Sequence, residues 1–113
     1  MSWDIDIACE HCDQAKFSSN YTSNTAHMLD KAATATGWVT KDVYIGDVID
    51  GMNAVEFSER MYPAIKWMED NVEELRKQNP VNGWGDVDKY IAWLYTITEA
   101  ADQNPTFKVK LCK

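Results

Sequence analysis

The sequence predicts an α+β domain in which a small antiparallel sheet packs on about four helices. Both ends of the chain alternate apolar and polar residues with the period of a strand, whereas the middle shows helical spacing. A terminal strand generally joins a sheet that already exists, so two N-terminal strands and the C-terminal strand are expected to form one sheet. The length of 113 residues suits a single domain, residues 1–113, with one core.

Three strands are expected, at residues 3–9, 15–21 and 106–111. In the first, Trp3, Ile5 and Ile7 alternate with aspartates, a pattern typical of a half-buried strand. The second has a weaker pattern and returns after a short cysteine-containing turn. The third alternates apolar residues with lysines, which indicates one buried and one exposed face.

The first two expected helices are marked by their ends. Asn24 is expected to cap a helix that stops at Gly37. Residues 38–52 read as irregular, with glycines at turns. Asn53 with Glu56 resembles a capping box and starts the second helix, which we expect to be interrupted near Pro63 because proline lacks a backbone donor.

The other two expected helices are marked by apolar stripes. After Pro63 the stripe consists of Ile65, Met68, Val72 and Leu75. The last helix opens at Asp86 and ends at Asn104–Pro105, and its wide apolar face predicts that it is the most buried.

Composition excludes several classes of protein. A hydrophobic fraction of 45% with five tryptophans excludes a disordered chain. The net charge of −7 argues against a protein that binds nucleic-acid backbones. The longest apolar run, Ile91–Tyr95, is far too short for a membrane span. The first residues lack a secretory pattern, so a cytoplasmic location is expected, in the host cytoplasm if a phage encodes the chain.

The cysteines allow three interpretations. Cys9, Cys12 and Cys112 could bind zinc as thiolates, with a histidine completing the site, provided that the last strand lies beside the first. A redox dithiol at Cys9 and Cys12 is the second interpretation, although a helix should then follow and the residues after Cys12 form a poor one. The third is a plain hairpin connection with half-buried thiols.

Two segments are candidates for binding a polar ligand. Residues 18–25 are almost entirely neutral hydrogen-bonding side chains in a chain with 26% charged residues, and residues 82–85 place a tryptophan between glycines. Local turns and helix caps, and a tryptophan that fills the core, would explain the same residues without any ligand. The ligand interpretation gains if the two segments converge, because amide donors and stacking suit a base or sugar ring. The candidate ligand-binding residues are Asn20, Tyr21, Thr22, Asn24, Asn82, Gly83 and Trp84.

Catalytic patterns are scarce. The chain has no G-x-S-x-G, no H-E-x-x-H and no glycine-rich phosphate loop. Its two histidines, His11 and His27, have no evident catalytic partner. We therefore expect a protein without enzymatic activity, and a Cys-dependent hydrolase or thiol oxidoreductase using Cys9 and Cys12 is the enzymatic alternative.

Two asparagine-containing motifs resemble an uncharacterised family of small proteins from bacteriophages and bacteria. These proteins carry N-[IY]-T-x-N-x-A-x-M, L-D-G-M-[TN]-A-x-E and N-P-x-N-G-W-G-D motifs. The matching ranges here are Trp3–Ile7, Asn20–Met28, Ile49–Glu56, Asn79–Asp86 and Phe107–Leu111. The resemblance implies a phage-type origin and draws attention to Asn20, Thr22, Asn24, Asn82, Gly83, Trp84 and Gly85. Many members have a Pro- and Gly-containing turn at the position of Cys9–Cys12.

These observations lead to an expected function with two alternatives. The leading hypothesis is a small phage-type accessory protein that binds a host component or a host-derived, nucleotide-like small molecule, as counter-defence proteins do. The first alternative is an acidic inhibitor that binds a basic host enzyme through Asp4, Asp6, Glu69, Asp70, Glu73 and Glu74. The Cys-dependent enzyme is the other. The tyrosines and tryptophans could equally cover the interface of a homo-oligomer.

Overall fold

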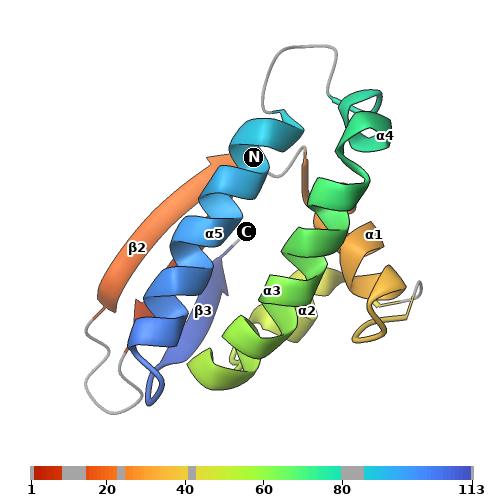
Figure 1. Cartoon of the computed structure of the whole chain (residues 1–113). Helices are drawn as coiled ribbons and strands as arrows, with labels where there is room; N and C mark the ends of the chain where they lie inside the picture. The colour runs from red at the N-terminus through yellow and green to blue at the C-terminus, as the bar shows by residue number, and fades with distance from the viewer. Residues whose placement is uncertain (1, 9–14, 23–24, 41–42, 80–85, 113) are drawn as a thin grey trace.

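The chain folds into a three-stranded sheet covered by helices, which confirms the α+β class. The computed structural model describes residues 2–8, 15–22, 25–40, 43–79 and 86–112. The strands are β1 (Ser2–Ala8), β2 (Ala15–Thr22) and β3 (Lys108–Cys112). The helices are α1 (Ala26–Ala35), α2 (Ile45–Ile49), α3 (Ala54–Asp70), α4 (Val72–Arg76) and α5 (Val87–Gln103) (Figure 1).

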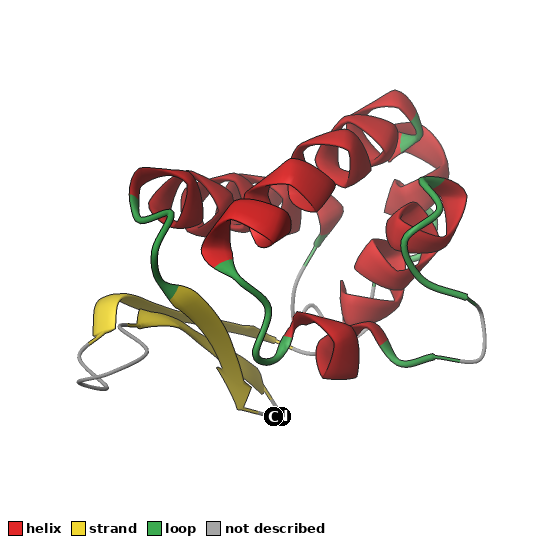
Figure 2. Cartoon of the chain, turned by 90° about the horizontal axis from the view of Figure 1, so that it is seen from below, coloured by secondary structure: helices red, strands yellow, loops and turns green. Residues whose placement is uncertain are grey.

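The sheet has the order β2-β1-β3, and β1 is antiparallel to both neighbours. The expected alternation in β1 is confirmed, since Trp3, Ile5 and Ile7 are buried while Asp4 is exposed. Figure 2 shows the reason for this alternation: the helices lie on one face of the sheet and leave the other face open. The apolar side chains of β1 therefore point under the helices and the aspartates point to the open face.

The outer edge of β3 is covered by the segment that joins α2 to α3. The Val109 N–H donates to the Met52 carbonyl and the Val109 carbonyl accepts from the Gly51 N–H, both at 2.8 Å. The Asp50 carboxylate accepts from the Leu111 N–H at 3.0 Å. Gly51 adopts a φ of 86°, which glycine reaches without strain. This edge is thereby closed to pairing with another strand.

Helix α3 runs without interruption through Pro63, so the expected break at that residue is wrong. Pro63 and Glu59, whose carbonyl loses its helical partner, are both exposed, and water can satisfy that carbonyl. The break occurs at Asn71 instead. There the side-chain amide donates to the Trp67 carbonyl at 2.8 Å and competes with the continuing helix. The apolar stripe that was expected on one helix is shared between α3 and α4.

The predicted start of α1 needs a correction. The N-cap position belongs to Thr25, without a side-chain cap, and Asn24 lies outside the described residues. The predicted end is confirmed, because Gly37 follows the helix with a φ of 86°. The Trp38 N–H then donates to the Ala33 carbonyl at 3.1 Å, which closes the last turn.

The region before α3 holds a helix that was not expected. Residues 38–52 were predicted to be irregular, but Ile45–Ile49 form the short helix α2, so the described residues contain five helices. Ile45 and Ile49 are both buried and lie one turn apart. Asn53 is the N-cap residue of α3 as predicted, yet its side chain makes no cap bond and Glu56 pairs with Arg60 at 3.1 Å. The expected capping box is therefore absent.

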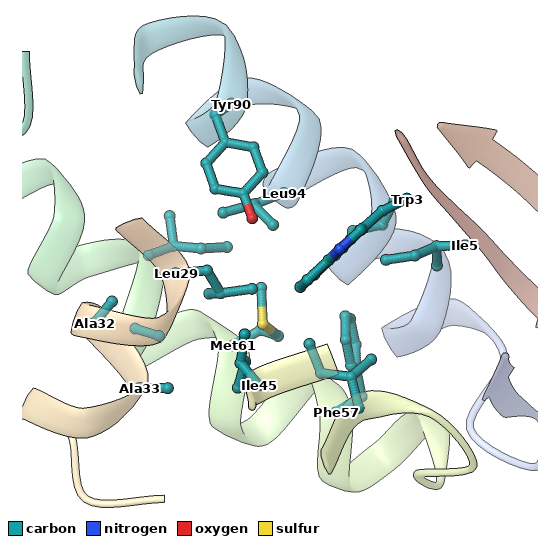
Figure 3. Packing of buried hydrophobic residues seen from close by; sticks show 14 of the residues in the cluster. Trp3, Ile5, Leu29, Ala32, Ala33, Ile45, Phe57, Met61, Tyr90 and Leu94 are labelled. Atoms are coloured by element: carbon teal, nitrogen blue, oxygen red, sulfur yellow. The ribbon is translucent and has the colours of Figure 1, made fainter. Parts of the chain in front are cut away.

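The core lies between the sheet, α1, α3 and α5. Figure 3 shows Trp3 and Phe57 packed among aliphatic side chains from these elements. The Trp3 indole N–H donates to the Tyr44 hydroxyl at 2.9 Å, and the two rings meet edge to face at 6.0 Å. Phe57 is fully buried. Among the described residues, no helix combines the length and the apolar character that crossing a membrane requires.

Candidate functional site

The end of β2 and the start of α5 are joined through Tyr21. The Tyr21 hydroxyl accepts from the Asp86 N–H at 3.3 Å and donates to the Asp86 carbonyl at 3.4 Å. Tyr21 belongs to the polar segment 18–25, and Asp86 directly follows the segment that contains the N-G-W-G motif. Tyr21 of the polar segment is therefore in contact with the N-cap residue of α5.

The first turn of α5 is closed by polar side chains. The Val87 N–H donates to the side-chain carbonyl of Asn79 at 2.9 Å, which ties residue 79 to the start of the helix across the N-G-W-G segment. Asp86 caps the helix as predicted, because its carboxylate accepts from the Lys89 N–H at 2.9 Å. Two of the free amide groups at this helix start are thus already paired.

Three aromatic rings lie beside this contact. The Tyr21 ring is 5.4 Å from the Tyr90 ring and 5.6 Å from the Trp93 ring, and the last two are stacked at 5.9 Å. The Trp93 indole N–H donates to the Ser19 hydroxyl at 2.9 Å, which fixes the ring over β2. Tyr21 and Trp93 are half-buried. The arrangement offers a rigid aromatic surface with hydroxyl groups near it.

The start of α1 has a different character from that of α5. Its N-cap residue Thr25 is buried and makes no side-chain cap bond, and its first turn contains no acidic residue. His27 lies in that turn and is exposed. Only residues 22–25 separate Tyr21 from α1 in the sequence.

The Tyr90 hydroxyl is buried without a hydrogen-bond partner in the described part of the chain. Its side chain is 1% exposed, and Figure 3 shows the hydroxyl directed into the core towards Leu94. Burial raises the pKa of this phenol far above its ordinary value of 10.0, and the Tyr44 and Tyr21 phenols add to the effect. Tyr90 therefore remains a neutral phenol and supports the site as a packed ring.

Acidic groups surround the outer side of α5. Asp88 forms a two-point ion pair with Arg76 at 2.9 and 3.1 Å, and this hydrogen bonding lowers the pKa of the Asp88 carboxyl from 3.8. A depression of about 220 Å³ beside the pair is lined by Glu69, Val72, Arg76, Asp88 and Ile91. A phosphate placed here would meet carboxylates, so this side of α5 disfavours anions.

A larger depression lies elsewhere on the molecule. It has about 430 Å³, runs between α1 and α3, and is lined by Asp30, Lys31, Thr34, Ala35 and Trp67. One carboxylate oxygen of Asp30 is buried without a partner in the described residues, while the Lys31 ammonium donates to Gln78 at 2.7 Å. Of the predicted ligand residues, neither Asn20 nor Tyr21 lines this depression.

The predicted ligand residues of β2 point in different directions. Asn20 is exposed on the open face of the sheet, opposite Asp4 in the register. Tyr21 points under α5, and Thr22 ends the strand. Asn24, Asn82, Gly83 and Trp84 lie outside the described residues. Of Asn20 and Tyr21, therefore, only Tyr21 faces α5.

Of the three cysteines of the predicted metal site, the structure describes Cys112. Cys112 pairs with Asp4 in the β1–β3 register, which confirms that the last strand lies beside the first. Ala8, the last described residue before Cys9, is four residues further along β1, about 13 Å away by strand rise. Cys9 and Cys12 lie outside the described residues, and among those described no group of three metal-binding side chains is present. The zinc site and the thiol enzyme remain predictions.

The wide apolar face expected on the last helix contains Tyr90 and Trp93, and Ser19 belongs to the polar segment 18–25. Their common location follows from β2 lying beneath α5, which local patterns do not reveal. The available signal was the three-residue spacing of Tyr90 and Trp93, which places both rings on one helix face. The search for relatives adds no further residues, since no protein-family model, curated protein or solved structure matches this chain.

Proposed function

We propose that this chain is a small, non-enzymatic accessory protein of phage type that binds a polar small molecule carrying a planar ring. The ligand would lie where β2 ends and α5 begins, against the aromatic cluster of Tyr21, Tyr90 and Trp93. The observation that carries the proposal is the pair of hydrogen bonds between the Tyr21 hydroxyl and the Asp86 backbone. Those bonds join Tyr21, which belongs to the first asparagine-containing motif, to Asp86, the last residue of the second.

The charges near the site favour an uncharged part of the ligand at α5. Val87 and Lys89 have their amide groups paired, and Asp86 and Asp88 are acidic, so α5 has little to offer a phosphate. A base or sugar ring could instead stack on the half-buried Tyr21 and Trp93 rings.

The test is native mass spectrometry of the freshly purified chain, followed by titration with the four ribonucleosides and their 5′-monophosphates. Tryptophan fluorescence is the signal, since Trp93 lies in the cluster. Tyr21→Phe should weaken binding by roughly fivefold or more, because it frees the Asp86 backbone while keeping the ring. The control is Tyr62→Phe, which removes the same group from an exposed tyrosine on α3 and should bind as the unmodified chain does.

A purified chain that carries no small molecule and responds to none of these probes would contradict the ligand. So would equal binding by the two tyrosine variants. A mass increase of one zinc ion per chain would instead support the metal interpretation of Cys9, Cys12 and Cys112.

A second candidate function, the acidic inhibitor of a host enzyme, is favoured by the junction of α3 and α4. Four exposed carboxylates gather there around a depression of about 370 Å³, from Glu69, Asp70, Glu73 and Glu74. Asp4 and Asp6 belong to the sheet, where Asp6 accepts from Ser18 at 2.6 Å, so they form a separate acidic area. The junction alone would face a basic partner.

Charge reversal separates this candidate from the ligand site. Asp70→Lys with Glu73→Lys should abolish capture of a basic partner in a pull-down from host lysate and leave nucleoside binding unchanged. The matched control is Glu56→Lys, which reverses a charge elsewhere on α3. If Glu56→Lys weakens capture as much as the double variant does, the interaction reflects net charge and no specific surface.

A further inference from the structure

The two edges of the sheet differ. In β3 the N–H and C=O groups of Val109 bond to residues 51 and 52, so these two groups point away from β1. Along an antiparallel strand, residues whose backbone groups bond to a given neighbour alternate with residues whose groups point away from it. Ile7 pairs with Val109, so the N–H and C=O groups of Ile7, and those of Ile5 two residues earlier, bond to β2. The N–H and C=O groups of Ser18 and Asn20 consequently point to the outer edge of β2. They have no partner in the described part of the chain, and Figure 1 shows β2 as the outermost strand on that side.

The free edge lacks the features that usually prevent strand pairing. Residues 17–22 contain no charged residue and no proline, in a chain with a net charge of −7. Edge strands that must remain single generally carry lysine, proline or a bulge in their middle. Here the irregularity of the β1–β2 pairing lies at its far end, next to Ala8. The middle of β2 is therefore regular in its pairing with β1, neutral, and without a described partner on its outer edge.

The flank of α5 beside this edge is also nearly neutral. Asp88 points towards α4, where it bonds to Arg76, and Tyr95 points towards α3, where it bonds to Glu69. The residues that share a helix face with Trp93, which bonds to Ser19 of β2, repeat every three to four positions and are uncharged apart from one lysine: Lys89, Trp93, Thr96, Ala100 and Gln103. A second molecule approaching the β2 edge would meet this flank with little electrostatic repulsion.

We propose that two copies of this chain pair through β2, antiparallel, about a twofold axis at Ser19. Ser18 of each copy then faces Asn20 of the other through backbone hydrogen bonds, and Phe17 faces Tyr21 on the helix-covered side. This register matches aromatic with aromatic and polar with polar side chains, so the edge is complementary to itself, as a twofold interface requires. It also brings the two α5 flanks together, which adds the area that a strand pair alone lacks.

Sedimentation velocity over a concentration series tests the proposal. The unmodified chain should approach the mass of a dimer. Ser18→Pro removes two hydrogen bonds across the axis and should weaken dimerisation by roughly tenfold or more. Ser18→Ala is the matched control, because it also loses the hydroxyl that bonds to Asp6 but keeps the N–H, and it should remain dimeric.

A cross-link tests the register even if the proline variant fails to fold. With the native cysteines replaced by serine, Ser19→Cys should form a disulfide-linked dimer on mild oxidation, because residues 19 of the two copies would face each other at a suitable distance. Val55→Cys, exposed on α3, should not. A chain that is monomeric at millimolar concentration overturns the proposal and leaves the edge to a strand from another protein. A dimer that resists Ser18→Pro and yields no Ser19→Cys cross-link also overturns it.

Discussion

Replacing Phe57 with alanine is expected to lower the free energy of unfolding by about 3–5 kcal/mol. The Phe57 side chain is fully buried near the middle of the core that α3 shares with α5 and the sheet (Figure 3). Removing the ring loses its transfer free energy and leaves a cavity that the surrounding helices cannot fill. Domains of this size are stable by only about 5–15 kcal/mol, so the loss is a large part of the total.

Urea unfolding followed by circular dichroism measures this effect. Val55→Ala is the matched control, since Val55 lies on the same helix with 42% of its surface exposed and should change the stability by less than about 0.5 kcal/mol. Equal losses in the two variants would mean that α3 does not bury Phe57. The dimer proposed above would make the midpoint depend on concentration, so both variants are compared at one concentration.

Replacing Tyr90 with phenylalanine is expected to have the opposite sign and to stabilise the fold by about 1–2 kcal/mol. The Tyr90 hydroxyl is buried without a partner among the described residues, so folding strips it of water and returns no hydrogen bond. The same change at Tyr21 should destabilise by about 1 kcal/mol, because it removes the bonds to the Asp86 backbone. Thermal unfolding of the two variants therefore gives shifts in opposite directions.

The gain at Tyr90 should depend on pH. Its phenol has a pKa above the ordinary value of 10.0 when folded, so the folded state resists ionisation more than the unfolded chain does. Because only the unfolded chain ionises readily at Tyr90, the free energy of unfolding is unaffected below pH 10 and falls as the pH rises above it. The advantage of Tyr90→Phe should widen in unfolding experiments above that pH. A constant or shrinking difference would show that the hydroxyl has found a partner.

The fold was predictable where the signal was local and repeated. Alternation in β1 marks its buried face, and Asp86 caps α5 as expected. Errors arose where one residue was weighed alone. Pro63 looked like a break, but an exposed helix face tolerates the lost hydrogen bond, whereas the asparagine at position 71 ended the helix through a side-chain bond. Helix α2 has five residues, too few for periodicity to be recognised.

The candidate site was predictable only in part. Two polar segments were evident from composition, yet the contacts of Ser19 and Tyr21 with α5 and its N-cap depend on β2 lying beneath α5, which tertiary packing decides. Tyr21 was included among the candidates for its place in a motif, and its contact with Asp86 became apparent only in the fold. Trp93 and Ser19 face each other across 74 positions of sequence, a separation that no local pattern reveals.

The position of β1 between β2 and β3 has a consequence for how the chain acquires its structure. The central strand is the first described element and one of its neighbours is the last. During synthesis the hairpin of β1 and β2 can form early, but its apolar face stays uncovered until α5 emerges, and the sheet is completed by the final strand. Loop closure between β1 and β3 spans nearly the whole chain, so their pairing should be a late step. Amide protons shared by these two strands should then report complete folding, and exchange with solvent only when the whole molecule opens.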